Sequence, residues 1–312
     1  MGYNIEEKLV IAVTSSALFD MTESNKIFEG LGEDEYRKYQ KKHIDQPLDK
    51  GVAFPFIKRL LALNKAFPEN PIEVVLLSKN SIETGLRAFR SIQYYGLDIS
   101  RACFTKGQRN YHYLPAFNSS LFLSSNPDDV KEALEAGYAA GLILNTKIED
   151  SEDDTELRLA FDFDGVIADD SSEKVYQEAK NNNNGNGLPT YLAHERSYRE
   201  HPLGVGPIGK LLQQISEFQK REQQQREKDS SYKKMLKTFI VTARNAPAHE
   251  RVVSTLLDLK IEVDEVFFMG GIDKSRVLNI LKPHIFFDDQ KIHLEHLDGI
   301  PAIHIPFGVA NQ

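Results

Sequence analysis

The chain has 312 residues, 41% of them hydrophobic and 27% charged, which is ordinary for a globular protein and long enough for two domains. Its formal net charge of −8 argues against a nucleic-acid polymer as partner, and its single cysteine, Cys103, excludes an intrachain disulfide and a cysteine-rich metal site. The first apolar run, 9–13, is too short for a signal peptide core, and no later run reaches the length of a membrane span. We therefore expect a cytoplasmic protein without a membrane partner, and the composition leaves a homo-oligomer open.

Apolar segments that are typical of strands alternate with helical segments along the whole chain. In the first half the strand segments are 8–13, 74–77, 102–104 and 121–123, and the helical segments are 23–39 and 81–95. In the second half the strand segments are 157–161, 238–241, 266–268 and 285–287, and the helical segments are 173–199 and 246–259. This alternation predicts an α/β fold with a doubly wound, mostly parallel sheet. The ordered agreement between the halves favours an internal duplication over a chance similarity of two α/β halves.

The ends of the strand segments carry different residues in the two halves. The second half places polar and charged residues there, namely Asp162, Asp164, Thr242, Lys274 and Asp288. Aligning the halves puts these residues of the first half at the same positions: Val13, Ser15, Leu77, Asn110 and Ser124. None of them can bind Mg²⁺ strongly or attack phosphorus. We therefore expect 151–312 to be the catalytic domain and 1–150 to be a related, degenerate half without catalytic function.

The sequence Asp162-Phe163-Asp164-Gly165 directly follows the strand segment 157–161. Open α/β sheets bind their ligands at the carboxyl ends of the strands, where both carboxylates are expected to lie. Two acids one residue apart can hold a hard cation while one carboxylate stays free for nucleophilic attack, and the glycine allows the backbone to turn. An acidic turn after a strand is common, so the motif gains meaning only together with polar residues at the ends of later strands.

Thr242 closes the strand segment 238–241 and is expected to open a helix through Ala243 and Arg244. Free backbone N–H groups at a helix N-terminus, beside a hydroxyl group, suit a phosphate oxygen because the N–H groups and the helix dipole both favour negative charge. A simple helix cap is the alternative interpretation of Thr242.

Lys274 and the pair Asp288-Asp289 complete the series. The lysine could neutralise a phosphate group, although most lysines are merely solvated. The two acids follow the apolar segment 284–287, and adjacent acids after a buried strand repel one another. A bound cation would offset that repulsion, whereas two exposed turn residues fit so hydrophobic a strand less well.

The order D-x-D-G, T, K and DD resembles that of the haloacid dehalogenase superfamily of phosphatases. Nearly the whole chain is similar to the cytosolic 5′-nucleotidase I family, the AMP-preferring type. The longest phrases that carry this resemblance are Val241-Thr242-Ala243-Arg244-Asn245-Ala246-Pro247-Ala248-His249-Glu250-Arg251, Tyr94-Tyr95-Gly96-Leu97-Asp98-Ile99 and Phe286-Phe287-Asp288-Asp289-Gln290. Shorter ones lie at 10–13 with 16–20, and at 117–118 with 121–124.

The resemblance implies an Mg²⁺-dependent hydrolase of nucleoside 5′-monophosphates, of the AMP/IMP or deoxynucleotide class, that works through an aspartyl-phosphate intermediate. The implied catalytic residues are Asp162 as nucleophile, Asp164 as general acid and base, Thr242 and Lys274. The implied phosphate-binding residues are Thr242, Ala243, Arg244 and Lys274. The implied residues of the metal site are Asp162, Asp164, Asp288 and Asp289. The resemblance also implies a haloacid dehalogenase-like domain with an inserted helical cap at about 170–237.

The sequence leaves three questions open. The motifs fix phosphoryl transfer better than they fix the substrate, so a phosphatase of sugar phosphates or other small phosphomonoesters is an alternative. A non-catalytic nucleotide-binding regulatory protein is a second alternative. In the first half, Lys79, Asn80 and Lys106 lie near the position where the second half would bind phosphate, which suggests either a vestigial or effector anion site or ordinary surface lysines. The asparagine-rich segment 181–187 is expected to form an exposed loop.

Overall fold

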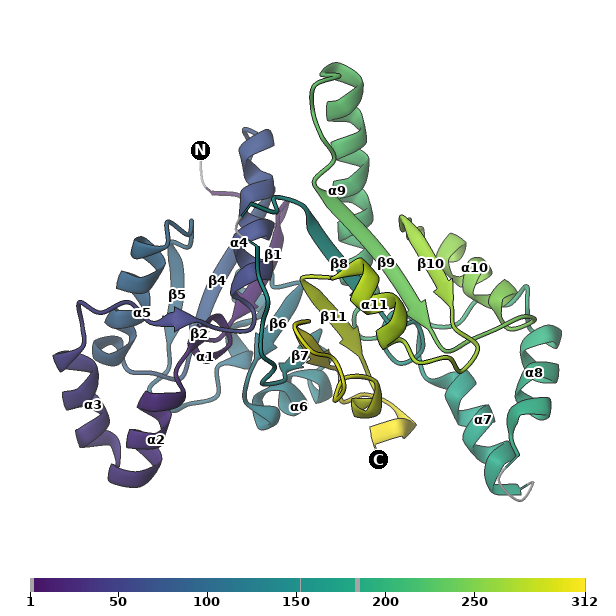
Figure 1. The fold of residues 1–312 in the computed structure, drawn as a ribbon, viewed down its shortest axis with the longest axis horizontal. Coiled ribbons are helices and arrows are strands. Elements are labelled where there is room, and N and C mark those ends of the chain that lie inside the picture. The colour runs from purple at the N-terminus through teal and green to yellow at the C-terminus, as the bar shows by residue number, and fades with distance from the viewer. Residues whose placement is uncertain (1–2, 152, 183–185, 312) are drawn as a thin grey trace. The chain divides into compact units, whose positions relative to one another are not determined.

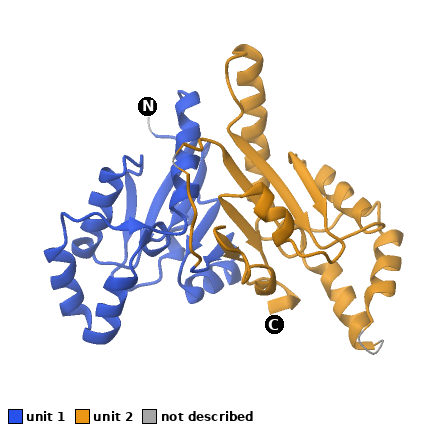
Figure 2. Ribbon diagram, in the orientation of Figure 1, with its two compact units in different colours: residues 1–145 blue, residues 146–312 orange. Residues whose placement is uncertain are grey.

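The computed structural model describes residues 3–151, 153–182 and 186–311. The chain divides into two compact units, residues 1–145 (unit 1) and 146–312 (unit 2), shown in Figure 2. Each unit is built on a parallel sheet flanked by helices, so the predicted α/β class is confirmed. The middle of the asparagine-rich segment, 183–185, lies outside the described residues. Within the described ranges, no helix combines the length and the apolar character that crossing a membrane requires.

Unit 1 contains a sheet in the order β7-β6-β1-β4-β5, in which every neighbouring pair is parallel. Its strands are β1 (Leu9–Val13), β4 (Ile72–Ser78), β5 (Arg101–Phe104), β6 (Leu121–Ser124) and β7 (Ala140–Ile143). Its α-helices are α1 (Ser15–Leu18), α2 (Thr22–Leu31), α3 (Glu33–Lys42), α4 (Phe54–Ala62), α5 (Ile82–Tyr94) and α6 (Pro127–Glu135). A separate antiparallel pair joins β2 (Phe19–Asp20) and β3 (Asp49–Lys50). Every residue of β1 and β4 is buried, which explains why all of them except Glu73 and Ser78 of β4 are apolar.

Unit 2 contains a parallel sheet in the order β10-β9-β8-β11-β12. Its strands are β8 (Leu157–Phe161), β9 (Leu236–Thr242), β10 (Glu265–Phe268), β11 (Ile285–Asp288) and β12 (Ala302–His304). Its α-helices are α7 (Ser171–Asn182), α8 (Leu188–Ser197), α9 (Gly209–Lys228), α10 (His249–Asp258) and α11 (Ser275–Leu281). Short 3₁₀ turns complete the chain at Leu63–Ala66, Tyr111–Tyr113, Pro115–Phe117, Lys291–His293 and Val309–Asn311.

The two sheets have the same topology when their strands are numbered within each unit. In both, the first strand lies at the centre, the second and third follow on one side, and the fourth and fifth follow on the other. The chain therefore reverses its direction of travel across the sheet beside the first strand. In open α/β sheets this reversal creates a crevice at the carboxyl ends of the strands, which is the usual place for a ligand. The shared topology agrees with the predicted internal duplication.

Strand register corrects the alignment of the two units at the first strand. Leu9 pairs with Ile72 in unit 1, and Leu157 pairs with Leu236 in unit 2. Thr14 N then donates to Leu123 O at 3.0 Å, as Asp162 N donates to Phe287 O at 2.8 Å. Thr14, rather than the predicted Val13, therefore stands where unit 2 has Asp162, and Ser16 replaces the predicted Ser15 opposite Asp164. The sequence alignment missed this because both strand ends are apolar and tolerate a shift of one residue.

The second strand shows the same one-residue error. Asn80 N donates to Ser78 Oγ at 3.2 Å, as Arg244 N donates to Thr242 Oγ1 at 3.2 Å. Ser78, rather than the predicted Leu77, is therefore the counterpart of Thr242. The remaining two correspondences are confirmed by the structure: Asn110 with Lys274, each of which precedes a helical turn, and Ser124 with Asp288.

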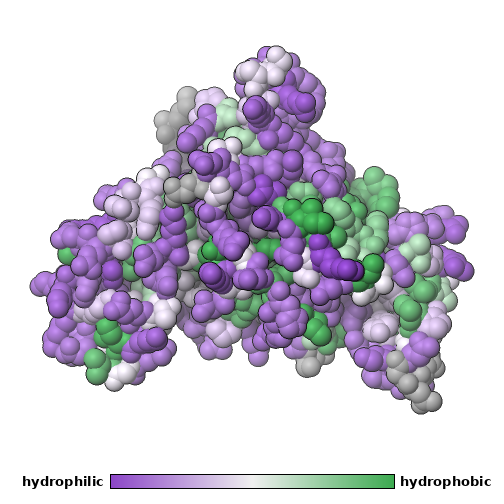
Figure 3. Space-filling view, viewed as in Figure 1, coloured by the Kyte–Doolittle hydropathy of each residue, from purple (hydrophilic) through white to green (hydrophobic). Residues whose placement is uncertain are grey.

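Two kinds of helix follow β8. Helices α7 and α8 lie side by side beyond the carboxyl ends of β8 and β9 (Figure 1). Helix α9 instead packs against β9 and the end of α10: Gln219 Nε2 donates to Thr238 Oγ1 of β9 at 3.1 Å, and Gln213 Nε2 donates to the carbonyl of Leu259, the residue after α10, at 2.8 Å. Its far end projects beyond the sheet and is mainly hydrophilic (Figure 3). Helix α9 is thus the crossover helix of a βαβ unit, and the pair α7–α8 is the insertion that precedes it.

Candidate active site

Two of the predicted acids lie side by side at the carboxyl ends of β8 and β11. Phe161 pairs with Phe287, so Asp162 and Asp288 are the next residues along two adjacent strands. Both side chains are buried, and they lie where the strand order of unit 2 reverses. The topology of the sheet, not a local turn, therefore brings these carboxylates together.

Lys274 joins the two acids. Its Nζ lies 2.9 Å from Asp162 Oδ2 and 2.7 Å from Asp288 Oδ2, and its side chain is only 2% exposed. Burial alone would lower the pKa of Lys274, but the two carboxylates raise that pKa above its ordinary value. The lysine is therefore a permanent positive charge at the base of the site.

The acids of this cluster differ in their tendency to ionise. Burial, together with repulsion from Asp288, raises the pKa of Asp162 to about 7 in spite of the nearby Lys274. Burial and the charges of Asp162 and Asp288 raise the pKa of Asp289 to about 9. Burial also opposes ionisation of Asp288, but Lys274 and His293 outweigh it and lower the pKa of Asp288. The cluster thus carries more carboxylates than its own cations can neutralise.

The Asp289 carboxylate is buried beside Gly165 of the D-x-D-G motif. Its Oδ1 is buried and has no hydrogen-bond partner within the described part of the chain. The other carboxylate oxygen of Asp289, Oδ2, lies close to Gly165, and a Cβ atom added at Gly165 would lie 2.6 Å from it. The backbone φ angle of Gly165 is +69°. Glycine is therefore required in the D-x-D-G motif for two reasons, a left-handed backbone and the close approach of this carboxylate.

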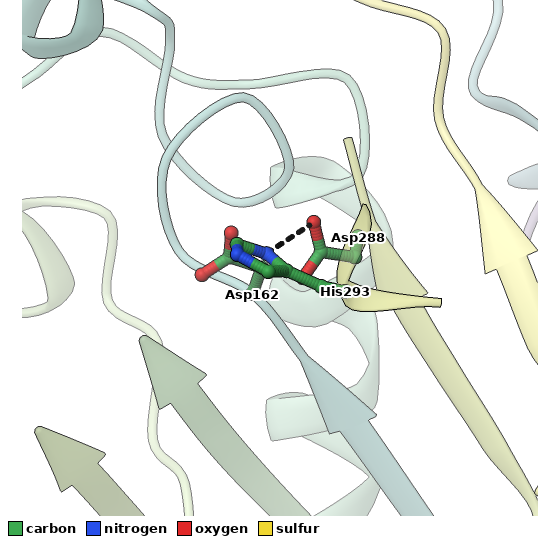
Figure 4. Close-up of side chains that lie close together, drawn as sticks. All are labelled: Asp162, Asp288 and His293. Carbon is green, nitrogen blue, oxygen red and sulfur yellow. Dashed lines mark hydrogen bonds and ion pairs between the residues drawn. The ribbon is translucent and has the colours of Figure 1, made fainter. Parts of the chain in front are cut away.

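The residues present suit a hard divalent cation. Asp162, Asp288 and His293 offer ligand atoms that all lie within 4.8 Å of one another, and Figure 4 shows the three side chains converging. Carboxylate oxygens are the donors that Mg²⁺ prefers, and the excess negative charge and the unpartnered Asp289 oxygen would both be offset by a cation. Of the four predicted metal-site residues, this cluster contains Asp162 and Asp288, while Asp289 is adjacent to it in the chain.

The side chain of Asp164 points into a different network. Arg244 binds it with two hydrogen bonds, Nε to Oδ2 at 2.7 Å and Nη2 to Oδ1 at 2.6 Å. The same guanidinium pairs with Glu195 of α8, which also accepts from Arg251 Nη1 at 2.8 Å. Glu195 is fully buried, yet its pKa is lowered because Arg244 and Arg251 outweigh the effect of burial. A buried ionic network therefore connects the D-x-D-G loop with the inserted helices.

Thr242 lies at the end of β9 and is buried. The expectation that it opens a helix is wrong, because α10 begins only at His249 and residues 243–248 form a loop. Pro247 accounts for the difference, since a proline disfavours helical conformation at the residue before it. Ala243 and Arg244 still follow the strand end directly, so their backbone lies at the edge of the sheet that carries Asp162.

The geometry can be compared with known proteins. The sequence model of the 5′-nucleotidase family matches residues 1–312. The chain belongs to the 5′-nucleotidase family. Human cytosolic 5′-nucleotidase 1B is 33% identical to it over 302 residues, which are 95% of this chain and 48% of the relative. This similarity confirms the resemblance to the cytosolic 5′-nucleotidase I family, although the chain spans only about half the length of that relative. No solved structure was found to match it.

Sequence reasoning about this member of the 5′-nucleotidase family missed three residues. His293 lies in the turn after β11, and its Nδ1 is 3.1 Å from Asp288 Oδ2. Its position five residues after Asp288 in a short turn is a signal that could have been used. Glu195 and Arg251 lie within helical segments and resemble surface residues. Arg251 ends one of the phrases that carry the family resemblance, but the sequence context of neither residue indicates a buried ion pair.

Proposed function

We propose that unit 2 is an Mg²⁺-dependent 5′-nucleotidase that hydrolyses nucleoside 5′-monophosphates of the AMP/IMP or deoxynucleotide class. The observation that carries this proposal is the carboxylate of Asp162 at the end of β8, held by Lys274 beside Asp288 in a chain of the 5′-nucleotidase family. The name of the human relative supports a cytosolic location.

Asp162 is the nucleophile in this proposal. Its Oδ1 accepts from Phe163 N at 2.7 Å, which orients the carboxylate, while Lys274 favours its ionised form. Attack on the phosphorus forms an aspartyl-phosphate on Asp162 and expels the ribose 5′-oxygen, and water then hydrolyses the phosphorylated aspartate. A bound Mg²⁺ would reduce the repulsion between the attacking carboxylate and the phosphate dianion.

Asp164 is the general acid in the first step and the general base in the second. Its side chain is 21% exposed, so it lies between the buried cluster and solvent, where a leaving group or a water molecule can reach it. The two hydrogen bonds from Arg244 hold the Asp164 carboxylate in position.

In this proposal the phosphate group is bound by residues at the carboxyl end of β9 and just before the start of α11. The Thr242 hydroxyl group, the backbone N–H groups of Ala243 and Arg244, and the Lys274 ammonium group are all donors at this edge of the sheet. The proposed cap consists of α7 and α8, since α9 packs against β9 and the end of α10. The cap is anchored to the phosphate-binding loop by the pair of Glu195 with Arg244.

The test is release of inorganic phosphate from a panel of nucleoside 5′-monophosphates and sugar phosphates, with Mg²⁺ and with EDTA. Selective release from nucleotides that requires Mg²⁺ and is lost in Asp162→Asn is the expected result. Activity confined to sugar phosphates would replace the proposed substrate class with another phosphomonoester. Absence of turnover on every substrate would leave a nucleotide-binding regulatory protein as the better explanation.

A further inference from the structure

Unit 1 contains a cavity at the place that corresponds to the active site of unit 2. The cavity has a volume of about 480 Å³. Its floor is formed at the carboxyl ends of β1, β4 and β6 by the counterparts of the unit 2 site residues, namely Thr14, Ser16, Ser78, Asn110 and Ser124. A cavity of this size is within the range of small-molecule sites, and it lies at the strand-order reversal where such folds bind ligands.

The floor of this cavity lacks the acids of unit 2. Thr14 and Ser16 stand where unit 2 has the two acids of its D-x-D-G motif, and Ser124 stands opposite Asp288. Hydroxyl groups neither repel a phosphate group nor need a cation to neutralise them, and a hydroxyl group can donate a hydrogen bond to a phosphate oxygen. Of the three, Ser124 Oγ donates to Asp129 Oδ2 at 3.5 Å. Phosphate could therefore bind here without a metal ion, because the floor positions that correspond to the unit 2 acids carry no carboxylate. The acids that line the cavity elsewhere are Glu33 and Asp129, and Asp129 pairs with Lys79.

Two lysines line the same cavity. Lys79 forms an ion pair with Asp129, whose position corresponds to that of His293 in unit 2. Lys106 is exposed and has no ion pair within the described residues of unit 1. Its positive charge at the mouth of the cavity is thus available to an anionic ligand, in addition to the neutral donors of the floor.

The N-terminus of α5 adds an electrostatic field that favours an anionic ligand in the cavity. This helix extends over Ile82–Tyr94, and its N-cap residue Ser81 and Thr84 of its first turn line the cavity. Ser81 Oγ accepts from Thr84 N at 3.3 Å, so the remaining N–H groups of the first turn are the ones open to a ligand. The N-terminus of such a helix carries partial positive charge and backbone N–H groups that suit phosphate. In unit 2 the corresponding helix begins only after the loop 243–248, so this feature is stronger in unit 1.

One buried group in the cavity has hydrogen-bonding capacity left over. Asn110 is fully buried and lines the cavity at the position of Lys274. Its Nδ2 donates to Leu77 O at 3.3 Å, while its Oδ1 has no partner among the described residues. A buried amide oxygen without a partner costs free energy, which a ligand hydroxyl group would recover.

The wall opposite the strands is aromatic. Phe28 of α2 and Tyr36 of α3 line the cavity, and their rings meet edge to face at 5.6 Å between centroids. The Tyr36 hydroxyl group donates to Asn80 Oδ1 at 3.0 Å, whereas the Phe28 ring is 50% exposed. An exposed aromatic ring above a site rich in phosphate donors is suited to stack on a planar base.

We propose that unit 1 binds a nucleoside phosphate in this cavity, without a metal ion and without hydrolysing it. The phosphate contacts the hydroxyl groups of the floor, Lys106 and the start of α5, and the base stacks on Phe28. This second site is independent of the reaction proposed for unit 2, since it uses none of the residues of that site.

Equilibrium binding to the Asp162→Asn variant of the 312-residue chain tests the proposal, with AMP as the probe. In EDTA we expect one AMP per chain, and adenosine and inorganic phosphate should each bind more weakly because each lacks one half of the contacts. Lys106→Glu should weaken AMP binding in EDTA about tenfold through charge reversal. The matched control is Lys131→Glu, at a lysine of α6 whose side chain is 71% exposed and which does not line the cavity.

The base contact has its own pair of variants. Phe28→Ala should weaken AMP binding in EDTA by about fivefold to tenfold while leaving the weaker binding of inorganic phosphate unchanged. Leu31→Ala, at a residue of the same helix that is 68% exposed, should change neither. The proposal is overturned if AMP does not bind in EDTA, or if binding occurs but ignores both unit 1 variants. Equal binding of phosphate and AMP would overturn the nucleoside part of it. The nucleotidase reaction proposed for unit 2 is tested separately, by phosphate release from the wild-type chain. A negative result in that assay is therefore distinguishable from a negative result in these binding experiments.

Discussion

The two units of this chain place different chemistry on the same scaffold. Both have a five-stranded parallel sheet with the same strand order and the same hydrogen bonds at the ends of the first two strands. In unit 2 the strand ends carry buried acids and a buried lysine, whereas in unit 1 they carry hydroxyl groups and an amide. The sheet therefore determines where a ligand binds, and a handful of side chains determines whether it can react.

The comparison also explains why only one of the two sites calls for a metal ion. Burial, together with repulsion from neighbouring acids, raises the pKa values of Asp162 and Asp289, so the folded chain does not fully compensate their charges. Unit 1 avoids this cost because Thr14 and Ser124 are neutral, and its one buried acid at the cavity, Asp129, pairs with Lys79. The proposed catalytic site of unit 2 thus needs several buried carboxylates close together, whereas a site that only binds phosphate does not need them.

The largest expected effect is that of Asp162→Asn on turnover. The amide is nearly the same size but cannot form the phosphorylated intermediate, so kcat should fall by about 10⁴-fold or more. Initial rates of phosphate release from AMP with saturating Mg²⁺ measure this. The matched control is Asp258→Asn, at an exposed aspartate at the end of α10, which should keep the wild-type rate. A variant at Asp162 that retained a tenth of the activity would assign the chemistry elsewhere.

The second prediction concerns stability and the buried ionic network around Glu195. In unit 1 Asn80 stands at the position of Arg244, and the buried Arg87 donates to the neutral Gln40 Oε1 at 3.3 Å, where Arg251 of unit 2 meets the charged Glu195. Glu195→Gln removes the charge that faces both Arg244 and Arg251, and should lower the free energy of unfolding by about 3–5 kcal/mol. Denaturant unfolding of the full chain, followed by circular dichroism, gives this value.

The control for Glu195 is Glu217→Gln on the surface of α9. Glu217 accepts from Lys220 at 2.8 Å, but its side chain is 66% exposed. Breaking this pair should cost no more than about 0.5 kcal/mol. Similar losses for the two variants would mean that the buried network contributes no more than an ordinary surface pair.

Much of this fold could be predicted from the sequence, because continuous apolar runs reveal buried parallel strands. The acids Asp162 and Asp288 could be identified for the same reason, since each directly follows such a run. Residue-level alignment of the halves could not be predicted reliably. Val13 and Thr14 are both acceptable at a strand end, and only the hydrogen bond from Thr14 N to Leu123 O decides between them.

The contacts of the site were harder to predict than its position. His293 approaches the site through a turn, where only its short distance from Asp288 in the chain hints at a contact, and Glu195 approaches it through helix packing, which sequence patterns do not reveal. The pairing of Asp164 with Arg244 joins residues 80 positions apart in the chain. Such pairings are set by tertiary structure, so the side-chain roles of Asp164, Thr242 and Lys274 remain predictions that mutagenesis must test.

The third prediction concerns pH and cation binding by unit 2. Without a cation the pKa of Asp162 is about 7 and that of Asp289 about 9, so protons compete with Mg²⁺ below these values. Mg²⁺ affinity should therefore rise with pH, by about tenfold per unit between pH 7 and 9, and level off above that range. Calorimetric titration in buffers of different ionisation enthalpy should show net proton release. Affinity that is independent of pH would contradict the raised pKa values.

Stability should show the complementary trend. Both pKa values are higher in the folded protein than the value of about 4 expected for an unfolded aspartate. The folded state then binds more protons than the unfolded state between about pH 4 and 9, so in EDTA the free energy of unfolding should decrease as pH rises through this range. Thermal unfolding in EDTA and in Mg²⁺ checks the sign, and the stabilisation by Mg²⁺ should be greatest at high pH. Asp289→Asn should reduce both trends.

The smallest expected effect comes from giving unit 1 one of the acids of unit 2. Thr14→Asp places a carboxylate at the position that corresponds to Asp162, in a cavity where Asn110 rather than a lysine faces it. The new charge should weaken binding of AMP in EDTA about tenfold by repelling its phosphate group. Thr14→Ser is the matched control, because it keeps the hydroxyl group and should bind AMP as the wild type does. Addition of Mg²⁺ should restore part of the lost affinity in Thr14→Asp alone, since a cation is what the acids of unit 2 require. If Thr14→Asp bound AMP unchanged, the absence of acids in unit 1 could not be the reason for metal-independent binding there.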